Sequence, residues 1–367
     1  MEEKASNYVT VLLENGRKIT AGAADIPAEY SGIGKEAEVK RHIDVKLYHL
    51  LEEETGTSLS WGILTGVRPT KIAMKKLDEG MDETAFVSWF HETYMVSNEK
   101  ASLAWEIAGR EKQLLERLDY DNGYSLYVGI PFCPTVCSYC SFSSGALADW
   151  ESRGEDYLDA LCKELKFIAQ KSSLKKLNTI YIGGGTPTTL TAGQLERLLC
   201  CIDENFSREH LLEYTVEAGR PDSITREKLE VLRKHGITRI SINPQTMKQE
   251  TLDLIGRRHT VAQFLEAFDM ACRCGLDNIN TDLIAGLPGD DYEGFTQTLE
   301  GILRLDPESV TVHTLSMKRA SNLVIHRRAD YRVKDDAVRM VGLTADRLPR
   351  AGYRPYYLYR QSRTVGN

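Results

Sequence analysis

The amino-acid sequence predicts an α/β fold, a partial (β/α)6 barrel preceded by a smaller and mainly helical α+β domain. From residue 125 onward, strand-like apolar runs alternate with segments of helical apolar spacing, which is the pattern of βαβ units on a parallel sheet. The alternation occurs six times and therefore favours a partial barrel over a closed eight-fold one. The first 122 residues lack it and are assigned to a separate domain.

The expected strands and helices of the barrel follow one another along the chain. The strands cover residues 125–130, 179–182, 213–217, 239–242, 278–284 and 309–315. The helices cover residues 156–170, 192–205, 226–234, 261–274 and 292–304. Reacting groups of such barrels lie at the carboxyl ends of the strands, so the residues at those ends are the first candidates for a functional site.

The N-terminal domain, residues 1–122, is expected to mix a hairpin with helices. A strand at residues 8–13 ends at the turn dipeptide Asn15-Gly16. Helices are expected at residues 43–54, 81–94 and 99–118. The run 61–71 contains turn signals and is interpreted as a structural loop.

Composition limits the class of protein. Of the 367 residues, 42% are hydrophobic and 27% are charged, as in ordinary globular proteins. The net charge of −7 and the pI of about 5.7 argue against a nucleic-acid-binding protein. No apolar run approaches the roughly 20 residues that span a bilayer, and the N-terminus does not resemble a secretion signal. We expect a cytoplasmic monomer in a reducing, oxygen-poor setting.

Three cysteines follow the first expected barrel strand. Cys133, Cys137 and Cys140 have Cys-x3-Cys-x2-Cys spacing. A structural [4Fe-4S] cluster takes four thiolates, so three close cysteines predict a cluster with one iron open to another ligand. A zinc site usually needs a second pair of ligands, which is missing nearby, and a disulfide framework needs an oxidising compartment. The spacing therefore favours the cluster.

The other five cysteines occur in helix-like segments, where a free thiol packs as a small apolar side chain. They are Cys162, Cys200, Cys201, Cys272 and Cys274. Core packing is the preferred interpretation, and a remote fourth cluster ligand among them is the alternative.

Two further strand ends carry candidate ligand groups. The second strand ends in Gly183-Gly-Gly-Thr-Pro187, and consecutive glycines let a backbone approach a ligand closely. The alternative is a plain strand-to-helix turn. Glu217 ends the third strand, where a carboxylate is placed to bind ribose hydroxyls. The alternative for Glu217 is a solvated surface side chain.

Polar residues also stand at or near the later strands. Gln245 follows the fourth strand, and Asp282 interrupts an otherwise apolar strand, where a buried carboxylate needs a partner. Arg257 is a candidate to pair with a ligand carboxylate as a bidentate fork. Of Arg257 and its neighbour Arg258, one is expected to be solvated.

The cysteine motif, placed after a strand and followed by Phe142, resembles the radical S-adenosylmethionine (SAM) enzymes. In them the open iron binds the amino and carboxylate groups of SAM, and an electron cleaves SAM to a 5′-deoxyadenosyl radical that abstracts a substrate hydrogen. The resemblance implies a radical SAM barrel, a [4Fe-4S] cluster and SAM as cofactors. It also implies an electron donor such as flavodoxin or ferredoxin.

The motifs together resemble the oxygen-independent coproporphyrinogen III oxidase family over about residues 120–360. They are residues 127–142, 183–187 and 286–288 with Glu217, Gln245, Arg257 and Asp282. Gly129 and residues 66–71 are most similar to the HemZ branch of coproporphyrinogen dehydrogenases. The implied reaction decarboxylates two propionates of coproporphyrinogen III to vinyl groups, giving protoporphyrinogen IX for haem biosynthesis.

Two other functions are compatible with the resemblance. The HemW branch, which shares Phe at the position of Phe142, resembles a haem-trafficking chaperone. A radical SAM methyltransferase or ring-opening enzyme acting on a porphyrin is the third possibility. The partner molecule is accordingly a tetrapyrrole substrate or haem, with no nucleic acid involved.

The resemblance also implies individual roles for residues. Tyr127 would lie by the SAM sulfonium and is the candidate catalytic residue, Tyr139 would pack near the adenine, and Ser316 would sit at the adenine edge. The remaining SAM contacts would come from Gly184, Gly185, Thr186, Glu217, Gln245, Arg257 and Asp282.

Three departures from the family separate this sequence from the better-characterised oxidases. Those oxidases carry His where Gly129 stands and a further Cys where Phe142 stands. Relatives also continue beyond residue 367 into a region that helps to cover the substrate. We therefore expect a barrel domain at residues 123–330 and, at residues 331–367, the start of a truncated C-terminal region.

Overall fold

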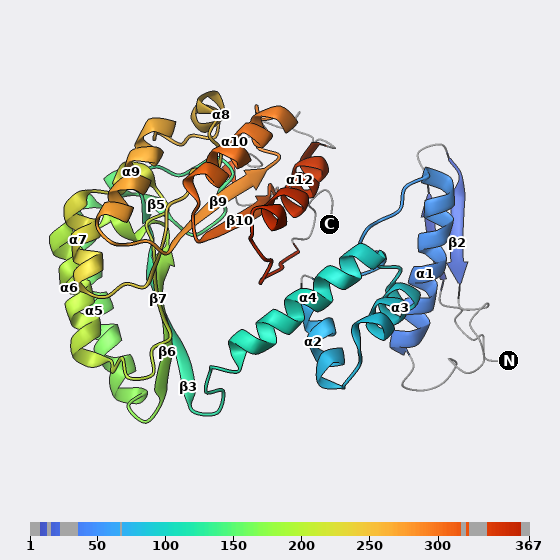
Figure 1. Ribbon diagram of the computed structural model, residues 1–367, viewed down its shortest axis with the longest axis horizontal. Helices are drawn as coiled ribbons and strands as arrows, with labels where there is room; N and C mark the ends of the chain where they lie inside the picture. The colour runs from blue at the N-terminus through green and yellow to red at the C-terminus, as the bar shows by residue number, and fades with distance from the viewer. Residues whose placement is uncertain are drawn as a thin grey trace. The chain divides into compact units, whose positions relative to one another are not determined.

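The computed structural model contains two compact units (Figure 1). The structure describes residues 8–12, 16–22, 36–66, 68–316, 321–322 and 336–360. One unit comprises the described residues up to 115 together with residues 355–360, and the other comprises residues 116–354. Parts of the expected C-terminal region, residues 331–335 and 361–367, lie outside the described residues. The described remainder of that region is divided between the two units.

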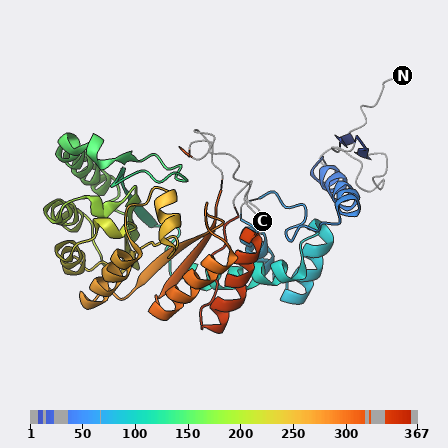
Figure 2. The same ribbon diagram turned by 90° about the horizontal axis from the view of Figure 1, so that it is seen from above.

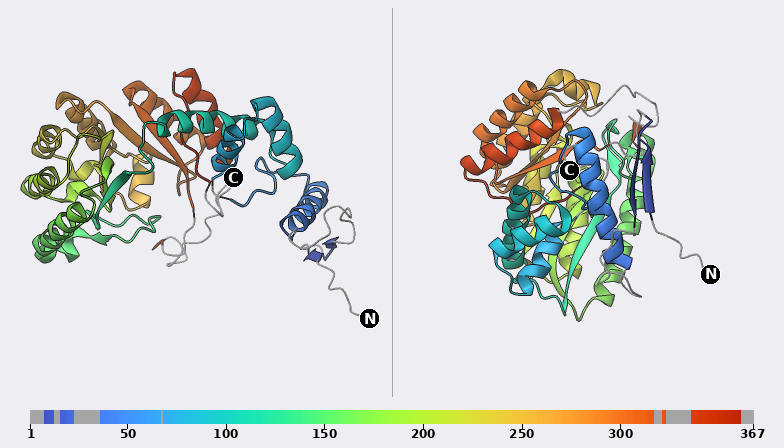
Figure 3. Two further views of the ribbon diagram at one scale, coloured as in Figure 1. Left: turned by 90° about the horizontal axis from the view of Figure 1, so that it is seen from below. Right: turned by 90° about the vertical axis from the view of Figure 1, so that its right-hand side faces the viewer.

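A hairpin and a long helix begin the first unit. Strands β1 (Tyr8–Leu12) and β2 (Lys18–Gly22) pair antiparallel, as expected, although Asn15 of the expected turn lies outside the described residues. Helix α1 (Glu36–Thr55) lies beside β2 (Figure 3). It begins seven residues before the expected start because polar residues precede its first apolar stripe.

Three further helices build the core of this unit: α2 (Thr70–Asp78), α3 (Glu83–Tyr94) and α4 (Asn98–Leu115). Phe86 and Phe90 of α3 are fully buried, and the Phe86 ring lies 5.1 Å from that of Trp105 on α4. The prediction of a structural loop at residues 61–71 is wrong at its end, because α2 begins at Thr70. Pro69 caps this helix, and its φ of −61° suits a first helical turn.

The end of the described chain packs into the same unit. Leu358 contacts this core, and the guanidinium of Arg360 lies over the buried ring of Trp61 at 5.5 Å. Arg360 also donates a hydrogen bond to the Leu64 carbonyl at 2.9 Å. The segment from Trp61 onward is thus held by residues almost 300 positions later in the sequence.

The second unit is built on one sheet of six parallel strands, which confirms the predicted partial barrel. The strands are β3 (Gly123–Ile130), β6 (Lys176–Gly184), β7 (Glu213–Glu217), β8 (Arg239–Ser241), β9 (Ile279–Ala285) and β10 (Ser309–Thr314). They lie in chain order, and β3 and β10 form the two edges. Each neighbouring pair is parallel.

Helices cover the outer side of this sheet (Figure 2). They are α5 (Gly154–Lys171), α6 (Ala192–Asn205), α7 (Arg226–Lys234), α9 (Val261–Arg273), α10 (Tyr292–Leu305) and α12 (Asp336–Arg350). The connecting segments contain the short helix α8 (Gln249–Leu254) and the 3-10 turns η3 (Leu147–Asp149), η4 (Glu151–Arg153), η5 (Pro187–Thr189) and η6 (Pro221–Ser223). Thr191 and Thr260 begin α6 and α9 with complete capping boxes. The short α8 and the terminal α12 were not expected from the sequence. In the described part of the chain, no helix is both long and apolar enough to cross a membrane.

The two faces of the sheet differ in chemistry because side chains alternate along each strand. Val128, Ile182 and Val216 are buried in the core formed with the helices. The opposite face is polar, and we call it the polar face. It comprises Tyr127, Tyr181, Glu217, Arg239, Asn280, Asp282, Thr311 and His313, which are linked by ring stacking, hydrogen bonds and a contact between His313 and Asp282.

Candidate active site

The three motif cysteines lie on one loop at the carboxyl end of β3. Strand β4 (Phe132–Cys133) pairs with β5 (Gly145–Ala146) and closes this loop. Inside it, the Cys140 N–H donates to the Cys137 carbonyl at 3.1 Å. Burial, and the sulfur atoms of Cys137 and Cys133, raise the pKa of the Cys140 thiol. The loop therefore brings the three sulfur atoms into one electrostatic neighbourhood.

Arg220 fixes the cysteine loop from the neighbouring part of the barrel. Its side chain is buried, and one guanidinium nitrogen donates to the Thr135 carbonyl at 2.9 Å and to the Cys137 sulfur at 3.7 Å. Asp222 accepts two hydrogen bonds from the same guanidinium, at 3.0 and 2.8 Å. The sequence analysis did not select Arg220.

The donor set fits an iron-sulfur cluster. Cys133, Cys137 and Cys140 are free thiols. Each has a hydrogen-bond donor at sulfur: the Thr186 hydroxyl at Cys133 at 3.5 Å, Arg220 at Cys137, and the Phe142 N–H at Cys140. Such donors tune the reduction potentials of clusters. The loop thus supplies three ligands and part of their surrounding shell.

The other five cysteines lie away from this loop in sequence and differ in burial. Cys162 and Cys201 are buried in the barrel core, as expected, and the Cys201 thiol faces the Cys162 carbonyl at 3.8 Å. The packing interpretation is wrong for Cys272, which is exposed. Cys272 lies on α9, and helical spacing alone did not distinguish the buried side of this helix from its exposed side.

The glycine run at the end of β6 packs directly against the cysteine loop. The Gly185 N–H donates to the Ile130 carbonyl at 2.7 Å. A Cβ on Gly185 would come within 2.5 Å of the Phe132 carbonyl oxygen, and Gly184 has a φ of +110°. Only glycine permits this close approach, and it places Thr186 beside Cys133.

Glu217 is partly buried at the end of β7. Its carboxylate accepts a hydrogen bond from the Tyr181 hydroxyl and another from the Gly184 N–H. Burial raises its pKa against the lowering effect of the Tyr181 hydrogen bond. Glu217 is therefore not the solvated side chain that was the alternative.

The two neighbouring arginines have different environments. Arg257 is buried, while Arg258 is exposed. Arg257 donates to the Asn243 carbonyl at 2.9 Å and to the Gly219 carbonyl at 2.8 Å. Its Nε is buried without a hydrogen-bond partner. Two neutral carbonyls do not neutralise the positive charge of the buried guanidinium. Arg257 is therefore suited to bind an anionic group of a ligand.

Asp282 lies on β9, next to the edge strand β10, and its carbonyl accepts a hydrogen bond from the Gln245 N–H at 3.0 Å. Asn243 and Asn280 donate to the two carboxylate oxygens of Asp282 at 2.9 and 2.8 Å. Gln245 has a left-handed backbone with φ of +69°, and its side-chain oxygen is buried without a partner. Strained non-glycine residues of this kind cluster at functional sites.

The aromatic candidates lie in two different places. Tyr139 packs on a small apolar cluster that includes Ile255, Leu287 and Leu315. Leu315 precedes Ser316, whose hydroxyl is buried without a partner. Tyr127, by contrast, is mostly exposed on the polar face and stacks on Tyr181 with ring centroids 5.9 Å apart.

Sequence reasoning missed several side chains that shape this region: Arg220, Tyr181, Asn243 and His313. Strand alternation was a usable signal for two of them. Tyr181 stands two residues before Gly183, and His313 closes the alternating run that begins at Ser309. Arg220 and Asn243 follow strand ends without a pattern that sets them apart.

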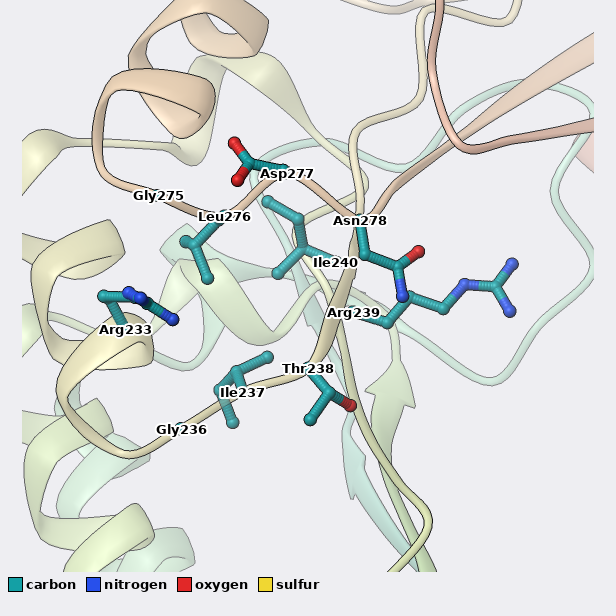
Figure 4. Close-up of a pocket in the computed structure, with 10 residues that line it drawn as sticks. All are labelled: Arg233, Gly236, Ile237, Thr238, Arg239, Ile240, Gly275, Leu276, Asp277 and Asn278. Carbon is teal, nitrogen blue, oxygen red and sulfur yellow. The ribbon is translucent and has the colours of Figure 1, made fainter.

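A pocket of about 350 Å³ lies at the opposite end of the strands (Figure 4). It is lined by the first residues of β8 and by the segments that precede β8 and β9. Figure 4 shows the side chains of Arg233 and Arg239 pointing in different directions, so they do not converge on one ligand. The pocket therefore has neither the position nor the convergent charge of the candidate active site.

Comparison with known proteins agrees with the site. A model of the radical SAM superfamily matches residues 127–302. The chain is 42% identical to the oxygen-independent coproporphyrinogen-III oxidase-like protein HemZ of Bacillus subtilis (strain 168). This match extends over 341 residues and covers 91% of this chain and 68% of that protein. The chain is 36% identical over 192 residues to the heme chaperone HemW of the same organism, covering 52% of this chain and 50% of the chaperone.

A solved structure gives the same assignment. Coproporphyrinogen III oxidase (HemN) from Escherichia coli, a radical SAM enzyme, matches with a TM-score of 0.58 and 27% identity, over 66% of this chain and 56% of that one. The fold and the three-cysteine loop define a radical SAM protein, with a [4Fe-4S] cluster and SAM as its cofactors. Within that class, the chain belongs to the HemZ/HemN-like family of coproporphyrinogen oxidase-like proteins.

Proposed function

We propose that this protein oxidatively decarboxylates propionate side chains of coproporphyrinogen III to vinyl groups, giving protoporphyrinogen IX. The observation that carries the proposal is the 42% identity to the HemZ protein over 91% of the chain. In each step a hydrogen atom leaves the propionate β-carbon, CO₂ leaves, and one electron passes to an acceptor. Two such steps convert two propionates.

Cys133, Cys137 and Cys140 would hold the cluster, because they are the three thiols that one loop brings together. When bound, the reduced cluster and SAM supply a 5′-deoxyadenosyl radical. An external reductant, such as flavodoxin or ferredoxin, would deliver the electron. Thr186 and Arg220 would donate hydrogen bonds to the ligand sulfur atoms.

Polar groups at the carboxyl ends of the barrel strands would hold SAM. The Arg257 guanidinium would bind its carboxylate, since its Nε is buried without a partner. Glu217 would bind the ribose, while the half-buried backbone of Gly184 and Gly185 and the side chains of Gln245 and Asp282 would complete the contacts. Tyr139 and Ser316 would frame the adenine, because both border the cluster around Leu315.

The polar face would receive the tetrapyrrole. Burial lowers the pKa of His313, but the Asp282 carboxylate 3.9 Å away outweighs it, so the pKa is raised. A protonated His313 would attract a propionate carboxylate. The stacked rings of Tyr127 and Tyr181 offer an apolar surface to a pyrrole ring, and Tyr127 would stand nearest to the reacting carbon.

Product analysis after anaerobic incubation tests the proposal. The reconstituted protein would be mixed with SAM, reductant and coproporphyrinogen III, and 5′-deoxyadenosine and vinyl products would be measured. We expect both products from the native chain and neither from the variant with all three motif cysteines replaced by Ala. Cleavage of SAM without any vinyl product would reject this substrate while retaining the radical SAM chemistry.

A second function, haem binding and delivery, is favoured by the similarity to HemW. The ring of Phe142, which is 77% exposed beside the cysteine loop, offers an apolar surface to a haem. Stoichiometric haem binding by the native chain without SAM cleavage would support delivery over decarboxylation. Phe142→Ala should then weaken haem binding while the cluster content stays unchanged.

A further inference from the structure

A second group of metal-ligating side chains lies outside the candidate active site, between α6 and α7. Glu196 and Cys200 stand four residues apart on α6, and His235 caps the end of α7. One oxygen, one sulfur and one nitrogen of these residues lie within 4.8 Å of one another. Figure 1 shows α6 and α7 side by side, and the two helices are in contact.

His235 presents its second ring nitrogen, Nε2, to this group. Its side chain is only 6% exposed, and its Nδ1 lies 2.7 Å from an Asp203 carboxylate oxygen. An ionised carboxylate only accepts, so Nδ1 carries the proton and donates it. The other nitrogen, Nε2, is buried without a hydrogen-bond partner and lies 3.2 Å from Glu196 Oε2.

The contact between Nε2 and Glu196 requires a positive charge between them. In the neutral ring that donates from Nδ1, Nε2 carries a lone pair, and a lone pair facing a carboxylate oxygen is repulsive. Either a second proton on the ring or a metal ion removes the repulsion. The Cys200 thiol next to the same carboxylate, 3.6 Å from Glu196 Oε1, favours a metal ion because it adds a third ligand atom.

The surrounding residues orient these ligands. Asp203 is itself held by an ion pair with Arg208, which also donates to the His235 carbonyl at 2.7 Å. A carboxylate on the far nitrogen of a metal-binding histidine is a common feature of zinc sites. Lys234 forms an ion pair with Glu196 Oε1, and the other carboxylate oxygen, Oε2, faces His235.

We propose that Glu196, Cys200 and His235 bind one Zn²⁺ ion that joins α6 to α7. One thiolate, one imidazole and one carboxylate are a zinc donor set, and a water molecule would complete the tetrahedron. Burial and the Glu196 carboxylate raise the pKa of the Cys200 thiol, so zinc binding releases a proton. The site is independent of the proposed function, because none of its ligands lies on the polar face or the cysteine loop.

The test must exclude metal binding at the cluster cysteines. The background is therefore the full chain with Cys133, Cys137 and Cys140 replaced by Ala, purified without metal. Zn²⁺ is titrated in competition with a chromophoric chelator, and Co²⁺ is used as a spectroscopic probe. We expect one equivalent of Zn²⁺, and a Co²⁺ complex with tetrahedral absorption and a thiolate charge-transfer band.

Single substitutions identify the ligands. Cys200→Ser should abolish the charge-transfer band, and His235→Gln should weaken Zn²⁺ binding at least tenfold. Asp203→Asn should weaken it by about 10 to 100-fold. Cys201→Ser is the matched control, because its thiol lies one residue away and faces the Cys162 carbonyl instead.

Circular dichroism and melting of the metal-free variants distinguish lost ligands from lost folding. If a folded Cys200→Ser variant retains the charge-transfer band, another thiol binds the metal and the proposal is wrong. Absence of stoichiometric Zn²⁺ binding by the folded background would also overturn it. In that case Glu196, His235 and Asp203 form only a network of polar contacts.

Discussion

The guanidinium of Arg220 lies 3.7 Å from the sulfur of Cys137, although the two residues are 83 positions apart in the sequence. The same nitrogen holds the Thr135 carbonyl, and Asp222 fixes the opposite side of the guanidinium. The contact places a buried positive charge on the loop proposed to bind the cluster. It makes Arg220 a positioning residue that acts through Cys137.

Removing the hydrogen bond from Arg220 to the Cys137 sulfur should lower the reduction potential of the cluster, because reduction adds a negative charge that this hydrogen bond stabilises. The change is Arg220→Gln combined with Asp222→Asn, which avoids leaving an unpaired carboxylate. We expect a decrease of roughly 65–130 mV, since a hydrogen bond to a charged group contributes about 1.5–3 kcal/mol and 59 mV corresponds to a tenfold change. Redox titration followed by electron paramagnetic resonance measures it.

Arg258→Gln is the matched control for that titration, because Arg258 is exposed. The cluster of the Arg258→Gln variant should have the same reduction potential as the cluster of the native protein. Equal potentials in the Arg220 variant and the native protein, with the same iron content, would show that Arg220 does not act on the cluster.

The cluster should depend on three cysteines and on none of the others. Replacing Cys133, Cys137 and Cys140 with Ala should remove the cluster, because no described cysteine outside the loop lies beside them. Replacing the other five with Ala should leave a full complement of about four iron atoms per chain. Iron and sulfide analysis after anaerobic reconstitution checks both variants. Retention of a cluster in the triple variant would contradict the ligand assignment.

SAM affinity should depend on Arg257 but not on Arg258. Arg257→Ala removes a buried cation with an unused Nε, so we expect SAM binding to weaken by about 1–3 kcal/mol, roughly 5 to 150-fold. Calorimetric titration of the reconstituted variants measures it, with Arg258→Ala as the control. Equal affinities in a folded, cluster-containing Arg257→Ala variant would reject the carboxylate-binding role.

The barrel could be predicted from the sequence because its determinants are local. Each strand carries alternating apolar residues such as Val128 and Ile130, and each helix has an apolar stripe. Capping residues such as Thr191 and Thr260 set the helix starts. The six-residue helix α8 was missed because so short a segment contains less than two turns of periodicity.

The candidate site was only partly predictable. A short motif fixes the cysteines, and the glycine run is local too. Arg220 approaches the loop only after β7 has folded beside it, and nothing in its own segment distinguishes it from a solvated arginine. His259 illustrates the same limit. Two arginines precede it in the sequence, which gives no sign that its side chain is fully buried. Burial first, and then the charge of Arg257, lower the pKa of His259 to about 3.

The last prediction concerns pH and Glu217, whose pKa is raised mainly by burial. A carboxyl with a raised pKa binds more protons in the folded than in the unfolded state, so stability falls as pH rises between the two pKa values. The cost is absent below the unfolded pKa, near the ordinary value of 4.5, and complete above the folded one. Glu217 therefore destabilises the protein at neutral pH.

Glu217→Gln should remove this cost while keeping an oxygen that accepts from Tyr181. In the cluster-free triple-cysteine background, its melting temperature should equal that of the unsubstituted background near pH 4 and exceed it at pH 7. Each kcal/mol corresponds to roughly 2–4 °C for a unit of this size. The reconstituted single variant should nevertheless bind SAM more weakly, since a neutral amide is a poorer acceptor for ribose hydroxyls. A stability difference that is constant with pH would show that burial of the Glu217 charge is not its cause, and unchanged SAM affinity would remove Glu217 from the proposed ribose contact.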